Sequence, residues 1–392
     1  MRLLIVPNDF PSAVRPQIGI FILRRAQAMA ALGHEVEVLT HVPLAPRIGE
    51  KWSAYAAIPE HDVVGGIPVR TVRVPMLPRM IGAEYAAPML ARELDRAIDR
   101  FRPDIVHASY LLPSGQLAVS QTRVPAIVTA HGLDAYDVPL RRAGLRRASA
   151  QAVAKAERVT AVSGYIAKCL QRLAFRHIDV IWNGADERFF YPRDRAECRR
   201  VLGLPPDRTI VAYAGYVLRD KGLFELVQAL ERIEATERPL LVIAGDGADR
   251  SELERETVAR GVETLFLGAM PHERIAEVFG AADIATLPSY YEGLPNVVCE
   301  AMLSARAVVA STAGGIPEIV QNGQSGLLVP PREVAPLVDA LLRMTRDRAF
   351  RAAAAESARA FASVNLTWRG SAKRYDALYR EVVERHKKAA VT

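Results

Sequence analysis

Short apolar runs alternate with amphipathic stretches along the first 180 residues of the chain. Several of these runs are apolar throughout, which is typical of strands that are buried on both faces. We expect strands at 3–6, 36–39, 69–74, 104–108, 126–130, 158–163 and 179–182. Helical patterns lie between them, for example at 18–33 and 89–102. This alternation predicts a parallel sheet with helices on both faces.

The same pattern restarts after a polar, Pro-containing segment, 184–208, which we interpret as a linker. The second series predicts strands at 209–215, 240–245, 264–268, 283–288, 307–311 and 326–329. Helices are expected near 222–235, 249–260, 271–281, 295–304, 315–321 and 333–345. The tail from about residue 346 reads as helical. Its last part carries an apolar stripe that should pack on another element, formed by Trp368, Tyr375, Leu378, Tyr379 and Val382.

Length and composition limit the number of domains, the membrane spans and the cellular compartment that we expect. A chain of 392 residues with 50% hydrophobic and 24% charged residues is ordinary globular protein, long enough for two or three domains. We expect no membrane-spanning helix, because no run of about 18 apolar residues occurs, and no signal peptide, because the apolar stretch 3–6 is short. Three scattered cysteines without metal-type spacing favour the cytosol: Cys169, Cys198 and Cys299.

Charge is unevenly spread along the chain. Residues 1–200 contain 28 Lys and Arg against 19 Asp and Glu, whereas residues 201–392 contain 23 against 25. The basic half indicates an anionic partner or only a solvated face. Nucleic acid is disfavoured, because no zinc finger, helix-turn-helix or aromatic-studded basic motif is present. One group of cations could attract an anionic membrane or a lipid-diphosphate-linked sugar: Arg141, Arg142, Arg146, Arg147, Lys155 and Arg158.

Polar and glycine residues follow several predicted strands. Ligands of open α/β sheets bind beyond the carboxyl ends of the strands, so with two such units we expect a site in the cleft between them. His131 directly follows strand 126–130 and could donate to a hydroxyl or a phosphate, or could satisfy local backbone instead. Strand 209–215 leads to Arg219 and Lys221 before a helix, an arrangement suited to phosphate, and Gly247 follows strand 240–245. Each of these is also compatible with a plain turn.

The segment YYEGLPNVVCE places seven residues between Glu292 and Glu300. Pro295 suits the first position of a helix, so Glu292 lies in the loop before it and Glu300 about 1.5 turns along it. Helix N–H groups between the acids would suit an anion, and each carboxylate would accept from hydroxyls. The spacing therefore favours a grip on a sugar nucleotide, with acids that only stabilise the helix dipole as the alternative.

The stretch SYYEGLPNVVCEAMLSARAVVASTAGGIPEIVQNGQSGLLVPP resembles the C-terminal signature of the retaining glycosyltransferases of family GT4, which have the GT-B fold. VTAHGLD, AVSGYI and WNGAD resemble further elements of that family, so the resemblance covers nearly the whole chain. It implies an α/β protein with two Rossmann-like domains facing across a cleft. The acceptor-binding domain would span 1–188 and the nucleotide-sugar domain 189–365, with a helix at 366–392 returning to the first.

The resemblance also implies residue roles. Glu300 would bind the ribose, Lys221 the diphosphate, and His131 the donor sugar near the reacting centre, while Gly19 would let backbone approach the phosphate. Glu292 would hold the sugar and the diphosphate together with the backbone of Gly293, Leu294, Pro295 and Asn296.

Two positions depart from the family pattern. Tyr216 stands where the family usually has Arg, so either Arg219 takes over that charge or the site has less charge. Ile18 precedes Gly19 where the family has a second Gly. Both departures affect the expected phosphate geometry and leave the expected fold unchanged.

The implied activity is retaining transfer of a hexose-type sugar to a hydroxyl of a glycan or lipid-linked acceptor, in the assembly of an exopolysaccharide, capsule or glycolipid. The donor would be a nucleotide-diphosphate sugar, with UDP favoured over GDP. We expect no cofactor and no metal, because the chain has no D-x-D motif. A cytoplasmic protein, peripheral on the inner face of the plasma membrane, would fit. The alternatives are a nucleotide-sugar 2-epimerase on the same scaffold and a non-catalytic nucleotide-sugar-binding protein.

Overall fold

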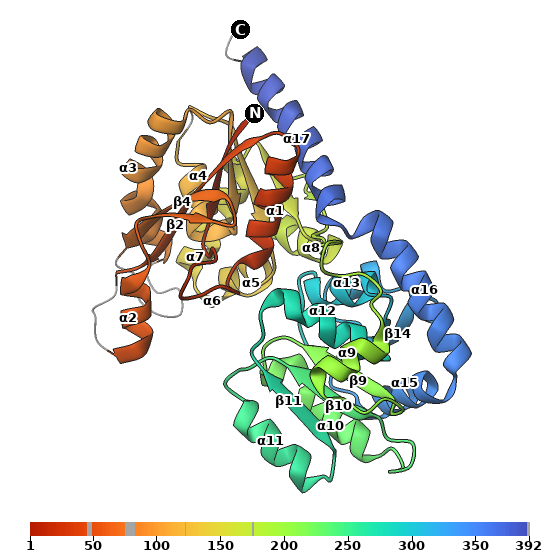
Figure 1. The fold of residues 1–392 in the computed structure, drawn as a ribbon. Coiled ribbons are helices and arrows are strands. Elements are labelled where there is room, and N and C mark those ends of the chain that lie inside the picture. Colours follow the sequence, from red (N-terminus) through yellow and green to blue (C-terminus); the bar gives the residue numbers. More distant parts are fainter. Residues whose placement is uncertain (45–48, 75–82, 122, 175, 390–392) are drawn as a thin grey trace. The chain divides into compact units, whose positions relative to one another are not determined.

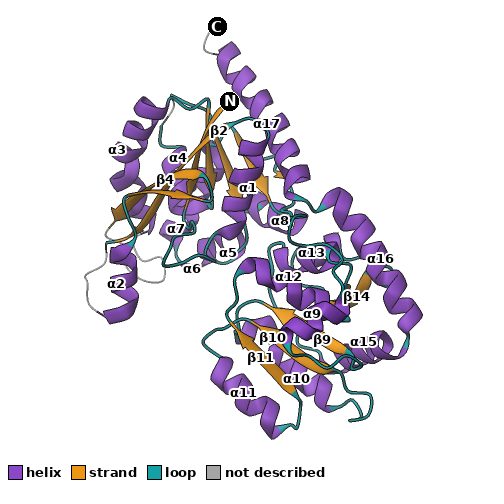
Figure 2. Ribbon diagram, viewed as in Figure 1, coloured by secondary structure: helices purple, strands orange, loops and turns teal. Residues whose placement is uncertain are grey.

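The chain forms two compact units, residues 1–182 with 368–392 and residues 183–367, so it passes between them twice. The computed structural model describes residues 1–44, 49–74, 83–121, 123–174 and 176–389 (Figure 1). Each unit is a parallel sheet with helices (Figure 2), apart from one antiparallel edge strand in the first, which confirms the predicted Rossmann-like α/β fold. In the described part of the chain, none of the helices has the length and apolar character needed to span a bilayer.

The sheet of the first unit has the order β3-β4-β2-β1-β5-β6-β7-β8. Its strands are β1 (Arg2–Pro7), β2 (Glu35–Pro43), β3 (His61–Val64), β4 (Ile67–Val74), β5 (Ile105–Ser109), β6 (Ala126–Ala130), β7 (Arg158–Ala161) and β8 (Asp179–Val180). Every pairing is parallel except that of β3 with β4. The sequence pattern did not predict β3, because its alternation of exposed and half-buried residues is that of an edge strand.

Helices and one tight segment after β5, Leu111–Gly115, complete this unit. The helices are α1 (Ile20–Ala31), α2 (Gly49–Ala57), α3 (Ala83–Phe101), α4 (Gln116–Ala118), α5 (Leu133–Tyr136), α6 (Val138–Arg141), α7 (Ala143–Lys155), α8 (Gly164–Gln171) and α17 (Trp368–Ala389). Residues of α1 and α17 share one apolar core with β1, β2, β4 and β5, including Leu3, Ile22, Ile105 and Tyr375. The C-terminal helix is therefore part of the core of the first unit.

A buried polar network also joins α17 to the sheet. His107 on β5 bonds through Nδ1 to the hydroxyl of Tyr379 and through Nε2 to Thr129 Oγ1, 2.6 Å away. Arg25 of α1, which is 1% exposed, donates to the Tyr375 hydroxyl at 3.4 Å. Burial, and then the charge of Arg25, lower the pKa of His107 well below its ordinary value, so its ring is neutral.

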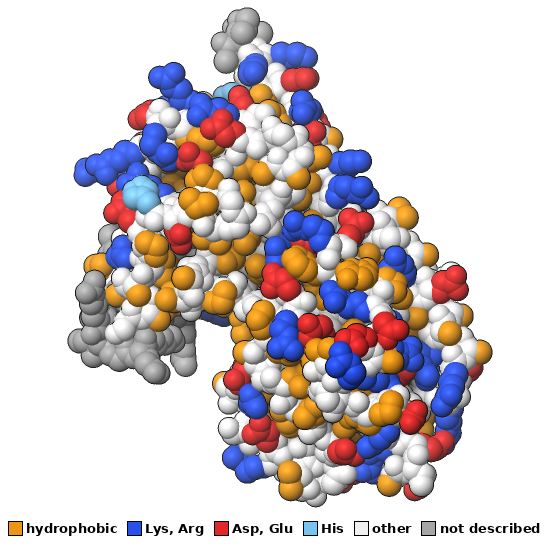
Figure 3. Space-filling model, in the orientation of Figure 1, with side chains coloured by type: hydrophobic (Ala, Val, Ile, Leu, Met, Phe, Trp, Pro, Cys, Tyr) orange, Lys and Arg blue, Asp and Glu red, His pale blue; other side chains and the backbone are white. Residues whose placement is uncertain are grey.

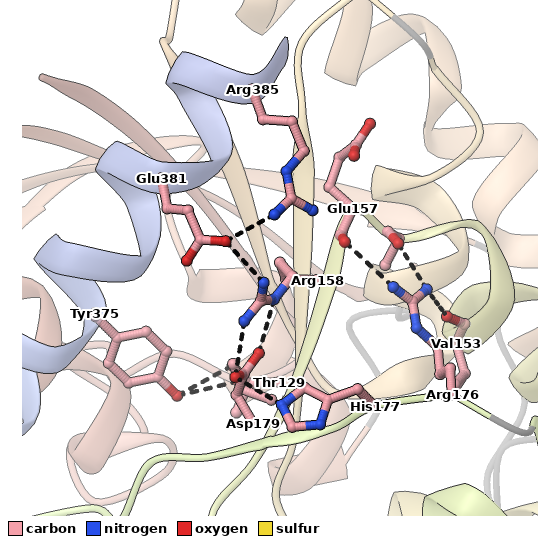
Figure 4. Close-up of polar contacts among 12 residues, drawn as sticks. Thr129, Val153, Glu157, Arg158, Arg176, His177, Asp179, Tyr375, Glu381 and Arg385 are labelled. Atoms are coloured by element: carbon pink, nitrogen blue, oxygen red, sulfur yellow. Dashed lines mark hydrogen bonds and ion pairs between the residues drawn. The ribbon is translucent and has the colours of Figure 1, made fainter.

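Arg158 on β7 joins α17 to β8, the edge strand of the same sheet (Figure 4). Its guanidinium contacts Asp179 on β8 and Glu381 on α17, each at 2.9 Å. The hydrogen bond to Asp179 raises the pKa of Arg158 above its ordinary value. Arg158 therefore serves an internal ion-pair network, and it does not belong with the exposed cations near Arg146 in the predicted membrane-facing group.

The sheet of the second unit is parallel throughout, in the order β11-β10-β9-β12-β13-β14. Its strands are β9 (Ile210–Ala214), β10 (Leu240–Ala244), β11 (Thr264–Gly268), β12 (Ile284–Leu287), β13 (Ala307–Ser311) and β14 (Gly326–Val329). From β9 the chain adds strands toward one edge, β10 and then β11, and from β12 it adds them toward the other edge, so the strand order reverses between β9 and β12. In doubly wound sheets such a switch point opens a crevice beyond the carboxyl ends of the two strands.

The helices of this unit include one that the sequence pattern did not predict. They are α9 (Arg195–Leu202), α10 (Leu223–Glu231), α11 (Arg250–Ala259), α12 (His272–Ala281), α13 (Asn296–Leu303), α14 (Ile316–Ile319), α15 (Val334–Arg346) and α16 (Arg348–Asn365). The interpretation of 184–208 as a linker is wrong over α9, which packs against α12. Asp194 caps its first turn by accepting from the N–H of Glu197 at 2.8 Å, and Gly203 ends it in the left-handed region.

We predict that Tyr379→Phe destabilises the first unit by about 1–3 kcal/mol, because it leaves a buried nitrogen of His107 without its partner. Urea unfolding followed by circular dichroism checks this. The loss is read from whichever transition shifts, since two units can unfold separately. Tyr191→Phe, at a ring that is 42% exposed, is the control. Equal midpoints for the two variants would contradict the structural role of the network.

Candidate active site

The loops after β9 and β12 meet at the switch point of the second unit. Lys221 ends the short turn Arg219–Lys221 that follows β9, and Glu292 lies in the loop between β12 and α13. The Lys221 ammonium lies 2.8 Å from Glu292 Oε1, and the two side chains are 23% and 13% exposed. The structure thus brings together two of the three predicted catalytic residues as a half-buried ion pair.

Close approaches of backbone hold this pair in place. Gly222 follows Lys221 with φ of +71°, and a Cβ there would lie 2.1 Å from the carbonyl oxygen of Pro288. Gly314 has φ of +55°, and its Cβ would lie 1.7 Å from the carbonyl oxygen of Glu292. Only glycine fits both positions. The loops that carry Lys221 and Glu292 are therefore locked to each other through the main chain.

The loop around Glu292 leads directly into α13. Leu294 is buried. The sequence predicts Pro295 as the first helical residue, but Pro295 is the N-cap, so α13 begins one residue later, at Asn296. Gly293 accepts a backbone hydrogen bond from Gly315 at 3.1 Å. Asn296 begins the helix, and its buried side-chain oxygen has no hydrogen-bond partner among the described residues. The first turn of α13 thus begins four residues after Glu292 in the sequence.

Glu300 has a separate partner. Its Oε1 lies 2.8 Å from Nε2 of His272, the first residue of α12, and both side chains are largely buried. Phe190 packs edge-on against the His272 ring, with centroids 5.2 Å apart. The two acids of the E-x7-E spacing therefore do not act on each other. His272 was not predicted, although it follows β11 as the other candidates follow their strands.

Arg219 and Tyr216 do not join the ion pair. The Arg219 guanidinium donates to Glu252 on α11 at 2.6 Å and lies 4.0 Å from the centre of the Phe224 ring. The Tyr216 side chain is 53% exposed, and its carbonyl accepts from the Tyr213 hydroxyl at 2.7 Å. The charge of Arg219 is thus already matched by an acid, and Lys221 is the cation that meets Glu292.

Gly247 lies in the same group of turns. A Cβ there would come within 2.2 Å of the carbonyl oxygen of Val217, so the turn after β10 is pressed against the turn after β9. Its own N–H donates to the Asp246 carboxylate at 2.8 Å. Close backbone packing is thus a sufficient reason for glycine at this position.

His131 and Gly19 belong to the first unit. The His131 ring packs against the rings of Phe21 and Tyr110, with centroids 4.9 and 5.0 Å away. Both ring nitrogens are covered, and neither has a hydrogen-bond partner among the described residues. Burial, and then the charge of Arg25, lower the pKa of His131 well below its ordinary value. The third predicted catalytic residue is therefore a neutral imidazole with unused hydrogen-bonding capacity.

Asp134, three residues later, fixes the backbone around His131. Its carboxylate accepts from the N–H groups of His131 at 3.0 Å, Gly132 at 2.8 Å and Leu111 at 3.1 Å. Leu111 follows Tyr110, a non-glycine residue with φ of +81°. Such strain clusters at functional sites, so Tyr110 is a candidate that the sequence reading missed. Its position directly after β5 was the available signal.

Gly19 caps α1 with φ of +71°. A Cβ there would lie 2.5 Å from the carbonyl oxygen of Asp9. Glycine is thus required by the packing of the loop after β1 on the start of α1. Among the described residues, no side chain caps the first turn of α1.

Comparison with known families gives two matches that together cover most of the chain. Residues 18–189 match the family described as Glycosyltransferase Family 4, and residues 194–361 match the one described as Glycosyl transferases group 1. The break between them falls next to the crossing from the first unit to the second.

Individual proteins show the same likeness. The chain is 29% identical to TuaC of Bacillus subtilis, whose name refers to teichuronic acid biosynthesis, over 89% of this chain and 90% of TuaC. It is 32% identical to the D-inositol 3-phosphate glycosyltransferase of Nocardia farcinica, over 84% and 77% of the two chains. A crystal structure of Anabaena HepE in complex with UDP has the same fold, with a TM-score of 0.77, 20% identity, and 97% and 100% coverage.

We predict that Gly314→Ala destabilises the second unit more than Gly323→Ala. Both glycines have positive φ, so each alanine costs about 1–2 kcal/mol in backbone strain. At Gly323 the new Cβ meets nothing within 4 Å, whereas at Gly314 it collides with the Glu292 carbonyl. Thermal unfolding measures the difference. An equal fall in Tm for the two variants would show that the close approach does not hold the loop.

Proposed function

Because the chain belongs to the group 1 glycosyltransferases of family 4, we propose that it transfers a hexose from a nucleotide-diphosphate donor to a hydroxyl of a glycan or lipid-linked acceptor. The observation that carries the proposal is the Lys221–Glu292 pair, held by glycine contacts at the switch point of the second unit. UDP is the favoured nucleotide, in line with the UDP complex of HepE, and GDP is the alternative.

Lys221 has a defined task in this reaction. As the bond to the sugar breaks, negative charge grows on the departing diphosphate. An ammonium fixed beside it stabilises the transition state more than the ground state. The first N–H groups of α13 point the positive end of a helix toward the same loop. The ion pair with Glu292 keeps the ammonium in position before the donor arrives.

Glu292 and Glu300 would bind different parts of the donor, the sugar and the ribose. Glu292 uses one oxygen for Lys221. Its other oxygen, which has no hydrogen bond to the described residues, would accept from a sugar hydroxyl. Glu300, oriented by His272, would accept from the ribose hydroxyls. This division explains why two acids with seven residues between them have different partners.

His131 would act on the reacting side of the sugar. A neutral imidazole has one N–H donor and one acceptor, and neither is used by a described residue. We propose that it donates to the donor sugar near the anomeric carbon, while the departing phosphate oxygen takes the proton of the acceptor hydroxyl. Attack from the same face then retains the configuration. In this scheme Lys221 stabilises the leaving group, so the mechanism does not require a metal or a cofactor.

A basic surface on α7 would bring this enzyme to an anionic membrane that carries the acceptor. Arg146, Arg147 and Lys155 are exposed on this helix, and Arg142 is exposed directly before it. Arg141 forms an ion pair with Asp137. In the second unit, basic and acidic side chains are interspersed on the face shown in Figure 3. The likeness to TuaC supports a role in cell-surface polysaccharide assembly.

A donor panel tests the proposed function. We predict that one of UDP-, GDP-, ADP- or dTDP-sugars raises the Tm, since a ligand at about 100 times its Kd adds about 2.7 kcal/mol of stability. Glu300→Ala should abolish most of this shift, and Glu263→Ala, at an exposed acid, should retain it. Transfer should continue in EDTA. If no donor stabilises the wild type, the proposed function is wrong. An unchanged shift in Glu300→Ala removes the ribose role.

Membrane attachment has its own test. We predict that the wild type sediments with vesicles that contain phosphatidylglycerol and not with pure phosphatidylcholine, because about 1 kcal/mol per cation favours the anionic surface. Arg146→Glu combined with Arg147→Glu should lose this binding. Arg255→Glu, on α11 of the second unit, is the matched control. Sedimentation of the double variant at the wild-type level would refute the surface.

A further inference from the structure

A polar pocket in the first unit lies beyond the carboxyl end of β1, against the last residues of β2 and against β3 and β4. Its polar lining includes Asp9, Ser12, Arg15, His41, Asp62 and Thr71. The enclosed part has a volume of only about 20 Å³, which is room for a group of about the size of one water molecule. A ligand would therefore insert a single small group and keep the rest of its body outside.

Two buried groups at this pocket lack partners. The hydroxyl of Ser12 is covered and has no hydrogen-bond partner among the described residues. His41 is 5% exposed, and its ring makes no recorded hydrogen bond or ion pair in the described part of the chain. Burial lowers the pKa of His41 to about 4, so the ring is neutral at physiological pH. A hydroxyl can donate to one of these groups and accept from the other.

The charges around the pocket disfavour an anion. Two carboxylates, Asp9 and Asp62, line it against one cation. That cation, Arg15, lies 3.9 Å from Asp9 and so is already shared with it. Burial raises the pKa of Asp9, and Arg15 opposes this effect. Carboxylates accept hydrogen bonds from hydroxyls and repel phosphates, so the lining matches a neutral sugar better than a phosphorylated one.

The pocket adjoins the three packed rings of Phe21, Tyr110 and His131 in the same unit. Burial raises the pKa of the Tyr110 hydroxyl, and the charges of Asp9 and Asp134 add to this effect. Asp9 is thus near Tyr110, whose ring packs on His131. The carbonyl of Asp9 also touches Gly19. One loop, residues 8–19, therefore connects the pocket to both predicted site residues of the first unit.

We propose that this pocket is an acceptor subsite, in which Ser12 and His41 bind one hydroxyl or hydroxymethyl group of an uncharged sugar. The inference rests on the proposed function and adds the class of acceptor. It also predicts a difference from the relative named for D-inositol 3-phosphate, whose acceptor carries a phosphate. Two carboxylates at the pocket would select against such an acceptor.

Saturation-transfer NMR on the full chain, in the presence of UDP, tests the subsite. The ligands are the methyl glycosides of glucose, galactose, mannose and N-acetylglucosamine, with D-inositol 3-phosphate as the charged comparison. We expect at least one glycoside to bind the wild type and the inositol phosphate to bind more weakly. Ser12→Leu, which fills the pocket, should weaken glycoside binding at least tenfold, and Ser12→Ala about threefold. Val14→Ser, at an exposed position of the same loop, should have no effect.

Thermal shifts with the donor panel, run on the same variants, separate the two hypotheses. Donor stabilisation that is unchanged in Ser12→Leu and Ser12→Ala, together with weakened glycoside binding, supports the subsite. If donors stabilise the wild type but no glycoside binds it, or Ser12→Ala and Ser12→Leu both bind glycosides as the wild type does, the subsite is wrong and the proposed function stands. Inositol phosphate binding that Ser12→Leu abolishes also overturns the inference. Failure of every donor instead rejects the proposed function.

Discussion

Backbone carbonyl groups occupy the space that side chains would need at Gly222 and Gly314. The carbonyls belong to Pro288 and Glu292, at 2.1 and 1.7 Å from the Cβ positions that any other residue would have. The turns after β9, β12 and β13 are thus fixed to one another by main chain rather than by rotamers. A site built on such contacts is preorganised, because neither Lys221 nor Glu292 must wait for a loop to order.

Much of the fold could be predicted because the central strands of both sheets are buried on two faces. Such strands read as apolar runs, as Leu3 to Val6 and Ile210 to Ala214 do. The failures fall where that signal is weak. Strand β3 lies at an edge and alternates, and α9 carries three arginines and little apolar surface. In α9 the informative residues were its ends, Asp194 and Gly203.

The site residues that could be predicted are those in the loop that follows a predicted strand. That rule brought out Lys221, Glu292 and His131. It could not show pairings between residues far apart in sequence, such as Glu300 with His272, or Arg219 with Glu252 on a neighbouring helix. The sequence also holds no sign that Tyr110 has a positive φ or that Asp134 accepts three backbone hydrogen bonds. Those features depend on how β5 and β6 are placed side by side.

The last helix completes the core of a unit whose first strand begins at residue 2. Residues 183–367 are contiguous, so the second unit can fold while the ribosome still holds the residues of α17. The first unit cannot finish at that stage, because Tyr375 and Tyr379 of α17 follow the whole second unit in the chain. During translation its apolar face, which includes Ile22 and Ile105, stays uncovered. The nascent chain therefore offers that face to any chaperone that binds apolar surface until α17 has been made.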